Sequence, residues 1–121
     1  MLTTGNPKKK AKAHKAPSGI TEARLAEMIE EATVDAYGES DQVTGWFTMF
    51  ENDLELPFEV EVFGVCVTVA AIDLRDDNRI VAVCKRGKEN QEIEVTELPI
   101  PMPRPVGSDW IEAYRRWRGG R

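Results

Sequence analysis

The spacing of apolar residues changes near residue 57, from a helical period before it to a strand period after it. Before that point, apolar residues recur three and four positions apart in two stretches, which predicts two amphipathic helices. The apolar positions are Leu25, Met28, Ile29, Ala32 and Ala36 in the first stretch, and Val43, Trp46, Phe47, Phe50 and Leu54 in the second. The short connection between the stretches predicts a helical hairpin.

Residues typical of helix ends bracket both stretches. Thr21 can cap the first helix through its hydroxyl, and Gly38 is expected to end it because glycine readily adopts the left-handed conformation that follows many helices. Ser40 or Asp41 can cap the second helix. We expect Pro57 to end the second helix, since proline has no backbone N–H to donate.

After Pro57 the residues alternate in polarity or form β-branched runs, both typical of strands. Turn residues at Gly64, at positions 76–78 and at positions 87–90 separate these runs. The expected strands are 58–62, 65–74, 79–85 and 92–95. Four short antiparallel strands cannot bury both faces as a flat sheet, so we expect them to curl into a small half-open, SH3-like barrel beside the helical hairpin.

The C-terminal part contains an extended segment and a third helix. Residues 99–105 have proline at every second position, which excludes a helix and predicts a strap lying across the barrel. Asp109 can cap a short final helix, and its apolar positions are Trp110, Ile111, Tyr114 and Trp117. The predicted class is therefore α+β.

The distribution of charge divides the chain into two parts. Residues 1–16 contain five lysines and no acid, so the rest of a chain of net charge −5 carries −10. We expect residues 1–18 to form a disordered basic tail, because they contain almost nothing to bury, and residues 19–121 to form a single domain. The tail either contacts an anionic surface such as nucleic acid or only solubilises an acidic domain.

Several classes of protein are not expected. The single histidine, His14, lies in the tail with no neighbour to orient it, and Cys66 and Cys84 lack the spacing of a zinc site, so neither an enzyme nor a structural zinc protein is predicted. The longest apolar run, 63–72, is too short to span a membrane. We expect a cytoplasmic protein with no small-molecule substrate and two cysteines that remain thiols.

The acidic residues are densest between positions 22 and 61, which hold twelve acids and one base. Asp35, Glu39 and Asp41 lie within seven residues around Gly38, at the expected end of the first helix. Carboxylate and carbonyl oxygens are the ligands that Ca²⁺ prefers, and the negative end of a helix dipole favours a cation. The EF-hand order is absent, and the residue twelfth from Asp35 is Trp46. The alternative is a capped turn with solvated acids.

A second acidic group lies at the end of the second helix, where carboxylates are unfavourable unless a cation offsets them. Glu51 and Asp53 are the candidate ligands there. Weaker candidates are Glu31, Glu55, Asp76 and Asp77. For the last two, an ordinary hairpin turn is the alternative.

Three sequence features together resemble a known family. They are the stretch 31–69, with its YGES turn and LPF helix end, the RIVAVCKRG strand from Arg79, and the WIEAYRRW helix from Trp110. The resemblance covers residues 20–118 and is to the cyanobacterial-type calcium-binding family often called CcbP. It implies a non-enzymatic, non-EF-hand acidic protein that buffers intracellular Ca²⁺. The family's acidic positions fall on Asp35, Glu39, Asp41, Glu51 and Asp53.

Two functions follow from these observations. The first is a Ca²⁺ buffer that changes little in conformation, because only Met28 and Met49 fall in the helical hairpin and a sensor would expose a methionine-rich groove. The second is a protein-interaction module in which a small barrel and basic tail dock a partner and any cation is incidental. The acidic domain itself should repel nucleic acid.

Overall fold

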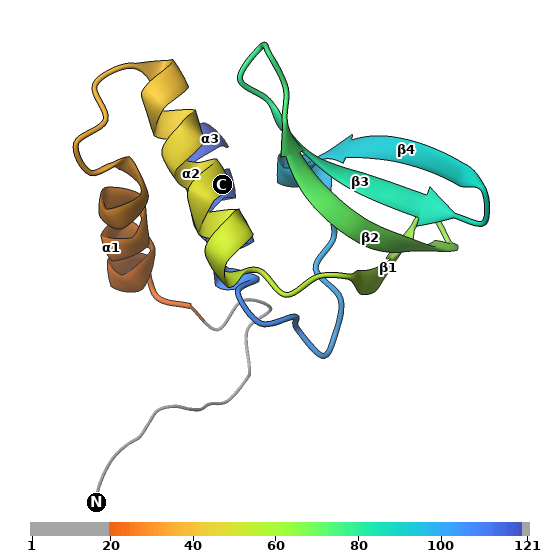
Figure 1. Ribbon diagram of the computed structural model, residues 1–121. Helices are drawn as coiled ribbons and strands as arrows, with labels where there is room; N and C mark the ends of the chain where they lie inside the picture. Colours follow the sequence, from red (N-terminus) through yellow and green to blue (C-terminus); the bar gives the residue numbers. More distant parts are fainter. Residues whose placement is uncertain (1–19, 120–121) are drawn as a thin grey trace, which may run out of the picture.

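The computed structural model describes residues 20–119, and the predicted tail, residues 1–18, lies outside them. Three helices and a four-stranded antiparallel sheet confirm the α+β class (Figure 1). The elements are α1 (Glu22–Thr33), α2 (Glu39–Asp53), β1 (Phe58–Val62), β2 (Val65–Leu74), β3 (Ile80–Arg86), β4 (Glu89–Glu94), the 3₁₀ helix η1 (Val95–Glu97) and α3 (Asp109–Gly119). Among residues 20–119 no helix combines the length and the apolar character needed to cross a membrane.

Helix α1 begins as predicted but ends early. The Thr21 hydroxyl accepts a hydrogen bond from the backbone N–H of Arg24 at 3.0 Å, which confirms the cap. The helix ends at Thr33 and not at Gly38, so Ala36 lies outside it. The prediction was wrong because the left-handed residue that reverses the chain is Asp35, with φ of 60°. Aspartate is one of the few residues other than glycine that tolerate this conformation.

Helix α2 is capped by Gly38, and the predicted caps Ser40 and Asp41 are both inside the helix. Gly45, in the middle of α2, packs against the backbone of α1. A Cβ added there would lie 2.1 Å from the carbonyl oxygen of Ala32. The two helices therefore contact each other backbone to backbone at this point, as close packing at a glycine allows.

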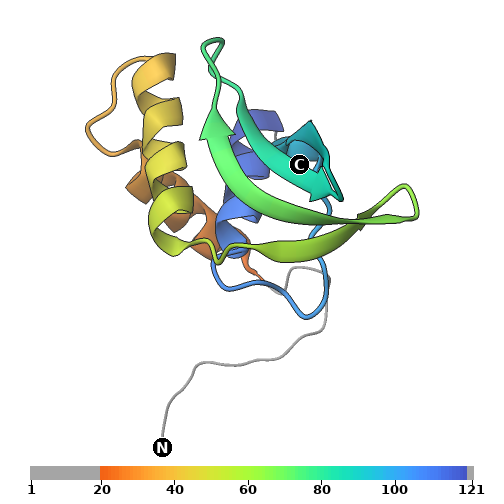
Figure 2. The ribbon, with the colours of Figure 1, turned by 45° about the vertical axis from the view of Figure 1, so that its right-hand side comes forward.

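The sheet has the strand order β1-β2-β3-β4, so β1 and β4 are its two edges. Each strand pairs antiparallel with the next, and the register of β2 against β3 shifts between Val69 and Ala71. The strands are strongly curved, and the three helices lie together on one side of the sheet (Figures 1 and 2). This arrangement is consistent with the predicted half-open barrel.

The last hairpin differs from the prediction in its bounds. Strand β3 runs to Arg86 and β4 begins at Glu89, so only two residues form the turn. Gly87, with φ of 60°, permits this tight turn. The sequence pattern failed for β4 because the strand is an exposed edge, and residues 89–92 are polar on both faces.

Aromatic side chains of α2 and α3 pack together within the hydrophobic core. Trp46 and Phe50 are fully buried, as the helical period predicted, and Tyr114 packs edge-on against both rings. Trp110 and Trp117 complete the contact with Trp46. Helix α3 therefore joins the helical hairpin to form one core with the buried face of the sheet.

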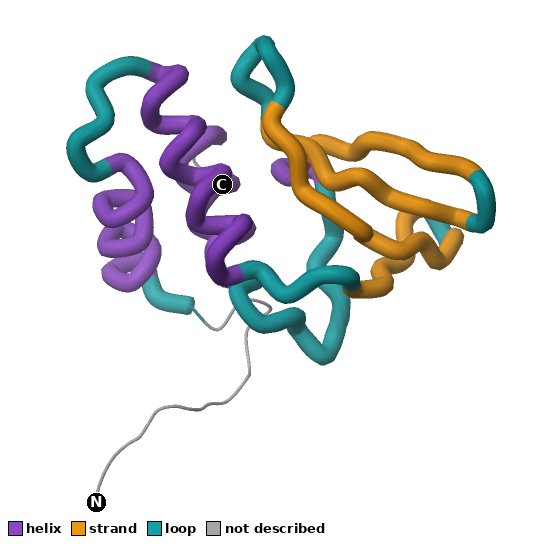
Figure 3. The backbone as a smooth tube through the Cα atoms, in the orientation of Figure 1, coloured by secondary structure: helices purple, strands orange, loops and turns teal. Residues whose placement is uncertain are grey.

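The proline-rich segment forms the long loop between η1 and α3 (Figure 3). It was expected to cross the barrel, but it passes below β1 and the end of α2 (Figures 1 and 2). Its end is fixed to the residues that follow α2, because the backbone N–H of Glu55 donates to the Val106 carbonyl at 2.8 Å. At Gly107, with φ of 84°, a Cβ would lie 2.1 Å from the Asp53 carbonyl oxygen.

Candidate functional site

The first group of predicted ligands lies in and beside the turn between α1 and α2. Asp35 follows α1 by two residues, and Glu39 and Asp41 lie in the first turn of α2. All three side chains are exposed. The left-handed backbone at Asp35 reverses the chain here, so Asp35 lies within the short connection and Glu39 and Asp41 directly follow it.

The electrostatic setting of this turn differs from the expectation that all three carboxylates lie at the negative end of a helix. Only Asp35 follows a helix C-terminus. Glu39 and Asp41 are at the N-terminus of α2, where the positive end of the helix dipole stabilises carboxylates in their charged form. The helix dipole therefore already offsets part of the negative charge of these two carboxylates.

The three carboxylates differ in their partners. Among residues 20–119, neither Asp35 nor Asp41 has a hydrogen-bond or ion-pair partner for its side chain, whereas Glu39 pairs with Arg118 of α3 at 3.2 Å. The carbonyl of Ala36, in the same turn, accepts a hydrogen bond from the Gln42 side chain at 3.4 Å. Asp35 and Asp41 are thus the carboxylates of this turn that no described group neutralises.

The second predicted group is used partly to hold the fold together. The carboxylate of Asp53 accepts a hydrogen bond from the indole Nε1 of Trp110 at 2.8 Å. The Glu55 carboxylate accepts one from the backbone N–H of Val106 at 3.0 Å. These contacts give two acids at the end of α2 a structural role, while Glu51 stays exposed.

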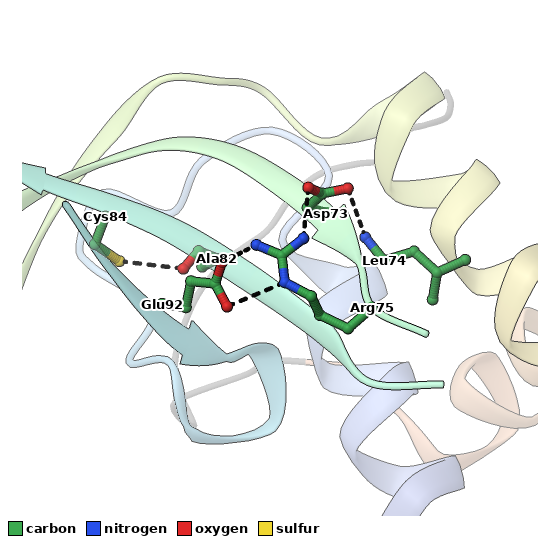
Figure 4. Close-up of polar contacts among 6 residues, drawn as sticks. All are labelled: Asp73, Leu74, Arg75, Ala82, Cys84 and Glu92. Carbon is green, nitrogen blue, oxygen red and sulfur yellow. Dashed lines mark hydrogen bonds and ion pairs between the residues drawn. The ribbon is translucent and has the colours of Figure 1, made fainter. Parts of the chain in front are cut away.

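Arginines neutralise most of the acids around the β2–β3 turn. Asp77 accepts a hydrogen bond from Arg79 at 2.8 Å, and this contact lowers the pKa of the Asp77 carboxyl below its ordinary value. Arg75 joins Asp73, at 2.7 Å, to Glu92 on the far strand (Figure 4). The hydrogen bond from Arg75 likewise lowers the pKa of Asp73.

Ca²⁺ fits the chemistry of the donors in the α1–α2 turn, although the side chains are not gathered around one point. Within the described residues, no three histidine, cysteine or acidic side chains are close enough together to hold a metal ion. Ca²⁺ accepts backbone carbonyls and water beside carboxylates, in flexible geometry, so two or three carboxylates can suffice. Asp35, Glu39 and Asp41 are the residues predicted to hold the ion. Of the other candidates, Glu31, Glu51 and Asp76 are exposed, and the remaining three accept hydrogen bonds that hold the fold together.

A separate cavity of about 600 Å³ lies at the far end of the sheet, between the β1–β2 and β3–β4 turns. Its lining combines apolar residues such as Val62, Ile93 and the fully exposed Phe63 with polar residues such as Arg86 and Gln91. Cys84 also lines it, and burial raises the pKa of this thiol. The cavity is remote from the α1–α2 turn (Figure 1).

Sequence reasoning missed Arg118 altogether. The residue was not among the predicted functional residues, yet its guanidinium reaches Glu39 and the backbone carbonyl of Asn78. Its position four residues after Tyr114 was the available signal, because that spacing places the two side chains on the same face of a helix. The contacts with α2 and the β2–β3 turn depend on tertiary structure and left no trace in the local pattern.

Comparisons with known proteins agree with this architecture. The model of a family described as "Calcium binding", Calci_bind_CcbP, matches residues 26–99, which include the α1–α2 turn. The structure titled "The crystal structure of Anabaena CcbP" is similar in fold, with a TM-score of 0.63 at 15% sequence identity, over 82% of this chain and 92% of that one. No curated protein sequence gave a significant match.

The extent of the family match decides the assignment. It covers more than half of the chain and includes both acidic helix ends and all four strands of the sheet. The structural similarity extends over the greater part of both chains. The chain therefore belongs to the CcbP family of calcium-binding proteins, and Ca²⁺ is the ion that this membership assigns to it.

Proposed function

We propose that the protein is a Ca²⁺ buffer whose principal site is the turn between α1 and α2, with Asp35, Glu39 and Asp41 as ligands. The observation that carries the proposal is the state of two of these carboxylates. Asp35 and Asp41 are exposed and have no side-chain partner among residues 20–119, while Glu39 of the same turn pairs with Arg118. Their uncompensated charge favours a bound cation.

The rest of the site would come from the backbone and from water. Carbonyl oxygens of residues 34–38 are within the same connection, and Ca²⁺ commonly takes six to eight oxygens of mixed origin. Glu51 and Asp53, at the other end of α2, are proposed as a weaker second site, because Asp53 already accepts the indole N–H of Trp110. Single carboxylates such as Glu31 and Asp76 contribute only diffuse attraction.

A buffer fits this fold better than a sensor does. Sensor proteins open a helix pair and expose a hydrophobic groove when they bind Ca²⁺. Here α1 and α2 are in backbone contact at Gly45, and Met28 lies in the buried core between them. The free thiols Cys66 and Cys84 are consistent with a reducing compartment, and support a role inside the cell.

The test is a calorimetric titration of the full chain with Ca²⁺, and separately with Mg²⁺, at about 0.15 M salt, where diffuse attraction is screened beyond about 8 Å. The variant D35N/D41N removes two charges from the site without changing side-chain size. The control E59Q/E61Q removes two charges from the exposed face of β1. We expect saturable Ca²⁺ binding that Mg²⁺ does not match, lost in the first variant and retained in the second. Equal losses in both variants would contradict the proposed site.

A further inference from the structure

The side chain of Arg118 joins three elements at one end of the molecule. Its guanidinium lies 3.2 Å from the Glu39 carboxylate at the start of α2 and donates to the Asn78 carbonyl in the β2–β3 turn at 2.7 Å. The start of α2 and the β2–β3 turn lie at the same end of the fold (Figure 1). A single positive charge of α3 therefore lies between two of the acidic turns.

Two aromatic rings fix the position of this charge. The guanidinium carbon of Arg118 is 5.5 Å from the ring centroid of Trp117 and 5.9 Å from that of Tyr114. Both distances are within the range of a cation–π interaction. The Arg118 side chain is only 27% exposed, so the guanidinium is held in place, unlike the solvated head of a surface lysine.

We propose that Arg118 is a built-in counter-cation that Ca²⁺ must displace from Glu39, and that this competition sets the calcium affinity of the α1–α2 turn. The inference rests on the proposed function, since it concerns the same site. The guanidinium already occupies one carboxylate that the ion needs, whereas Asp35 and Asp41 carry no such partner within the described residues 20–119. Among the described residues, Arg118 is thus a cation paired with a carboxylate of the proposed Ca²⁺ site.

The size of the effect follows from the exposure of the pair. An ion pair as accessible as Arg118–Glu39 changes an equilibrium constant by about two- to fivefold. Repulsion between the guanidinium and a doubly charged ion bound beside it adds to that change. Removing the charge should therefore lower the Kd for Ca²⁺ by about three- to tenfold.

The experiment compares three variants of the full chain by calorimetric titration with Ca²⁺. Arg118→Met removes the charge and keeps an apolar stem against Trp117 and Tyr114. Arg116→Met is the matched control, because it removes the same charge from the same helix, at a residue that pairs with Glu22 at 2.5 Å. Arg118→Lys restores a cation.

We expect tighter binding in Arg118→Met, less than about a twofold change in Arg116→Met, and an affinity close to that of the wild type in Arg118→Lys. An unchanged or weaker affinity in Arg118→Met, or equal gains in both methionine variants, would overturn the inference. If the wild type binds Ca²⁺ and D35N/D41N does not, the proposed function stands even when Arg118→Met has no effect. If the wild type does not bind Ca²⁺, both proposals fail.

A measurement on the wild type keeps the inference testable if Arg118→Met does not fold. The Nε–Hε resonance of Arg118, assigned by its loss in Arg118→Lys, is followed by NMR as Ca²⁺ is added. Displacement from Glu39 predicts a saturable shift of this resonance, with the same midpoint as the heat of binding, and little shift of the Arg116 resonance. An Arg118 resonance that stays fixed while Ca²⁺ binds would show that the guanidinium does not leave Glu39.

Discussion

Substitution of Gly45 by alanine gives a test in which two physical effects have opposite signs. Gly45 lies inside α2, where alanine is favoured over glycine by about 1 kcal/mol through helix propensity alone. The added Cβ would, however, lie 2.1 Å from the carbonyl oxygen of Ala32 and 3.3 Å from its carbonyl carbon. Both contacts are to the backbone of α1, so no side chain can rotate to make room.

The structure predicts that steric overlap outweighs propensity. Relief of the overlap requires α1 and α2 to separate by about an ångström along a contact that buries Met28 and Trp46. Overpacking of this kind costs about 1–3 kcal/mol, and more where the backbone must move. We expect G45A to be about 2 kcal/mol less stable than the wild type. For a domain of about 100 residues this corresponds to a fall in Tm of about 8–16 °C.

The assay is urea unfolding followed by circular dichroism and tryptophan fluorescence. The matched control is G38A, because Gly38 has an ordinary φ of −126° and, its two chain neighbours apart, no atom of the described residues lies within 4 Å of the position that its Cβ would take. Its loss of stability should not exceed about 1 kcal/mol, the usual cost of a poorer N-cap residue. If G45A proves as stable as the wild type, or more stable, the backbone contact between α1 and α2 is not present in solution.

Three further outcomes follow from other contacts. W110F and D53N should each lower the free energy of unfolding by about 1.5–3 kcal/mol, the range for a hydrogen bond to a charged group, and a double-mutant cycle should show that the two losses are not additive. In the native protein a thiol reagent should modify the exposed Cys66 quickly. The buried Cys84, whose pKa is raised by burial, should react only when the protein unfolds, and equal rates of modification would refute its burial. The pKa of Asp77 is lowered from 3.8 by the arginine two residues later. The ion pair of Asp77 with Arg79 therefore stabilises the fold above about pH 4, and this stabilisation is lost as the pH falls through the lower, folded-state pKa. In D77N the free energy of unfolding should consequently fall less on acidification than in the wild type.

The fold was predictable where one face of an element is buried and the residues on it are large. The period of Trp46, Phe50 and Leu54 identified α2, and the same reasoning placed Trp110 and Tyr114 on the buried face of α3. Burial fixes which side of such a helix faces the core, so the sequence pattern and the structure agree.

The predicted bounds of helices and strands were wrong where the backbone conformation, and not the burial of side chains, determines where an element begins or ends. Asp35 adopts the left-handed conformation that glycine usually adopts after a helix. Helix α1 therefore ends at Thr33, five residues before the predicted end at Gly38. The polar edge strand β4 has no buried face from residue 89 to 92, so alternation could not reveal it. In both cases tertiary packing required a turn at that point of the chain, and this requirement outweighed the preference of the local sequence for a helix or strand.

The candidate ligands could be found from the sequence, but their partners could not. Carboxylates clustered at helix ends can be recognised in the sequence, which led to the prediction of Asp35, Glu39 and Asp41. The contacts of Asp53 with Trp110 and of Glu39 with Arg118 join residues 57 and 79 positions apart. Such contacts distinguish acids held by the fold from acids available to an ion, and only the folded chain brings them together.

The measurement that tests the account most directly is the change in backbone amide resonances of the full chain as Ca²⁺ is added at stoichiometric concentration. The account predicts large, saturable shifts in residues 34–41, with a common midpoint, and small shifts along β1 and β2. Shifts that rise linearly with Ca²⁺ and spread over all acidic surfaces would contradict a site at the α1–α2 turn. Saturable shifts confined to another part of the chain would contradict it equally.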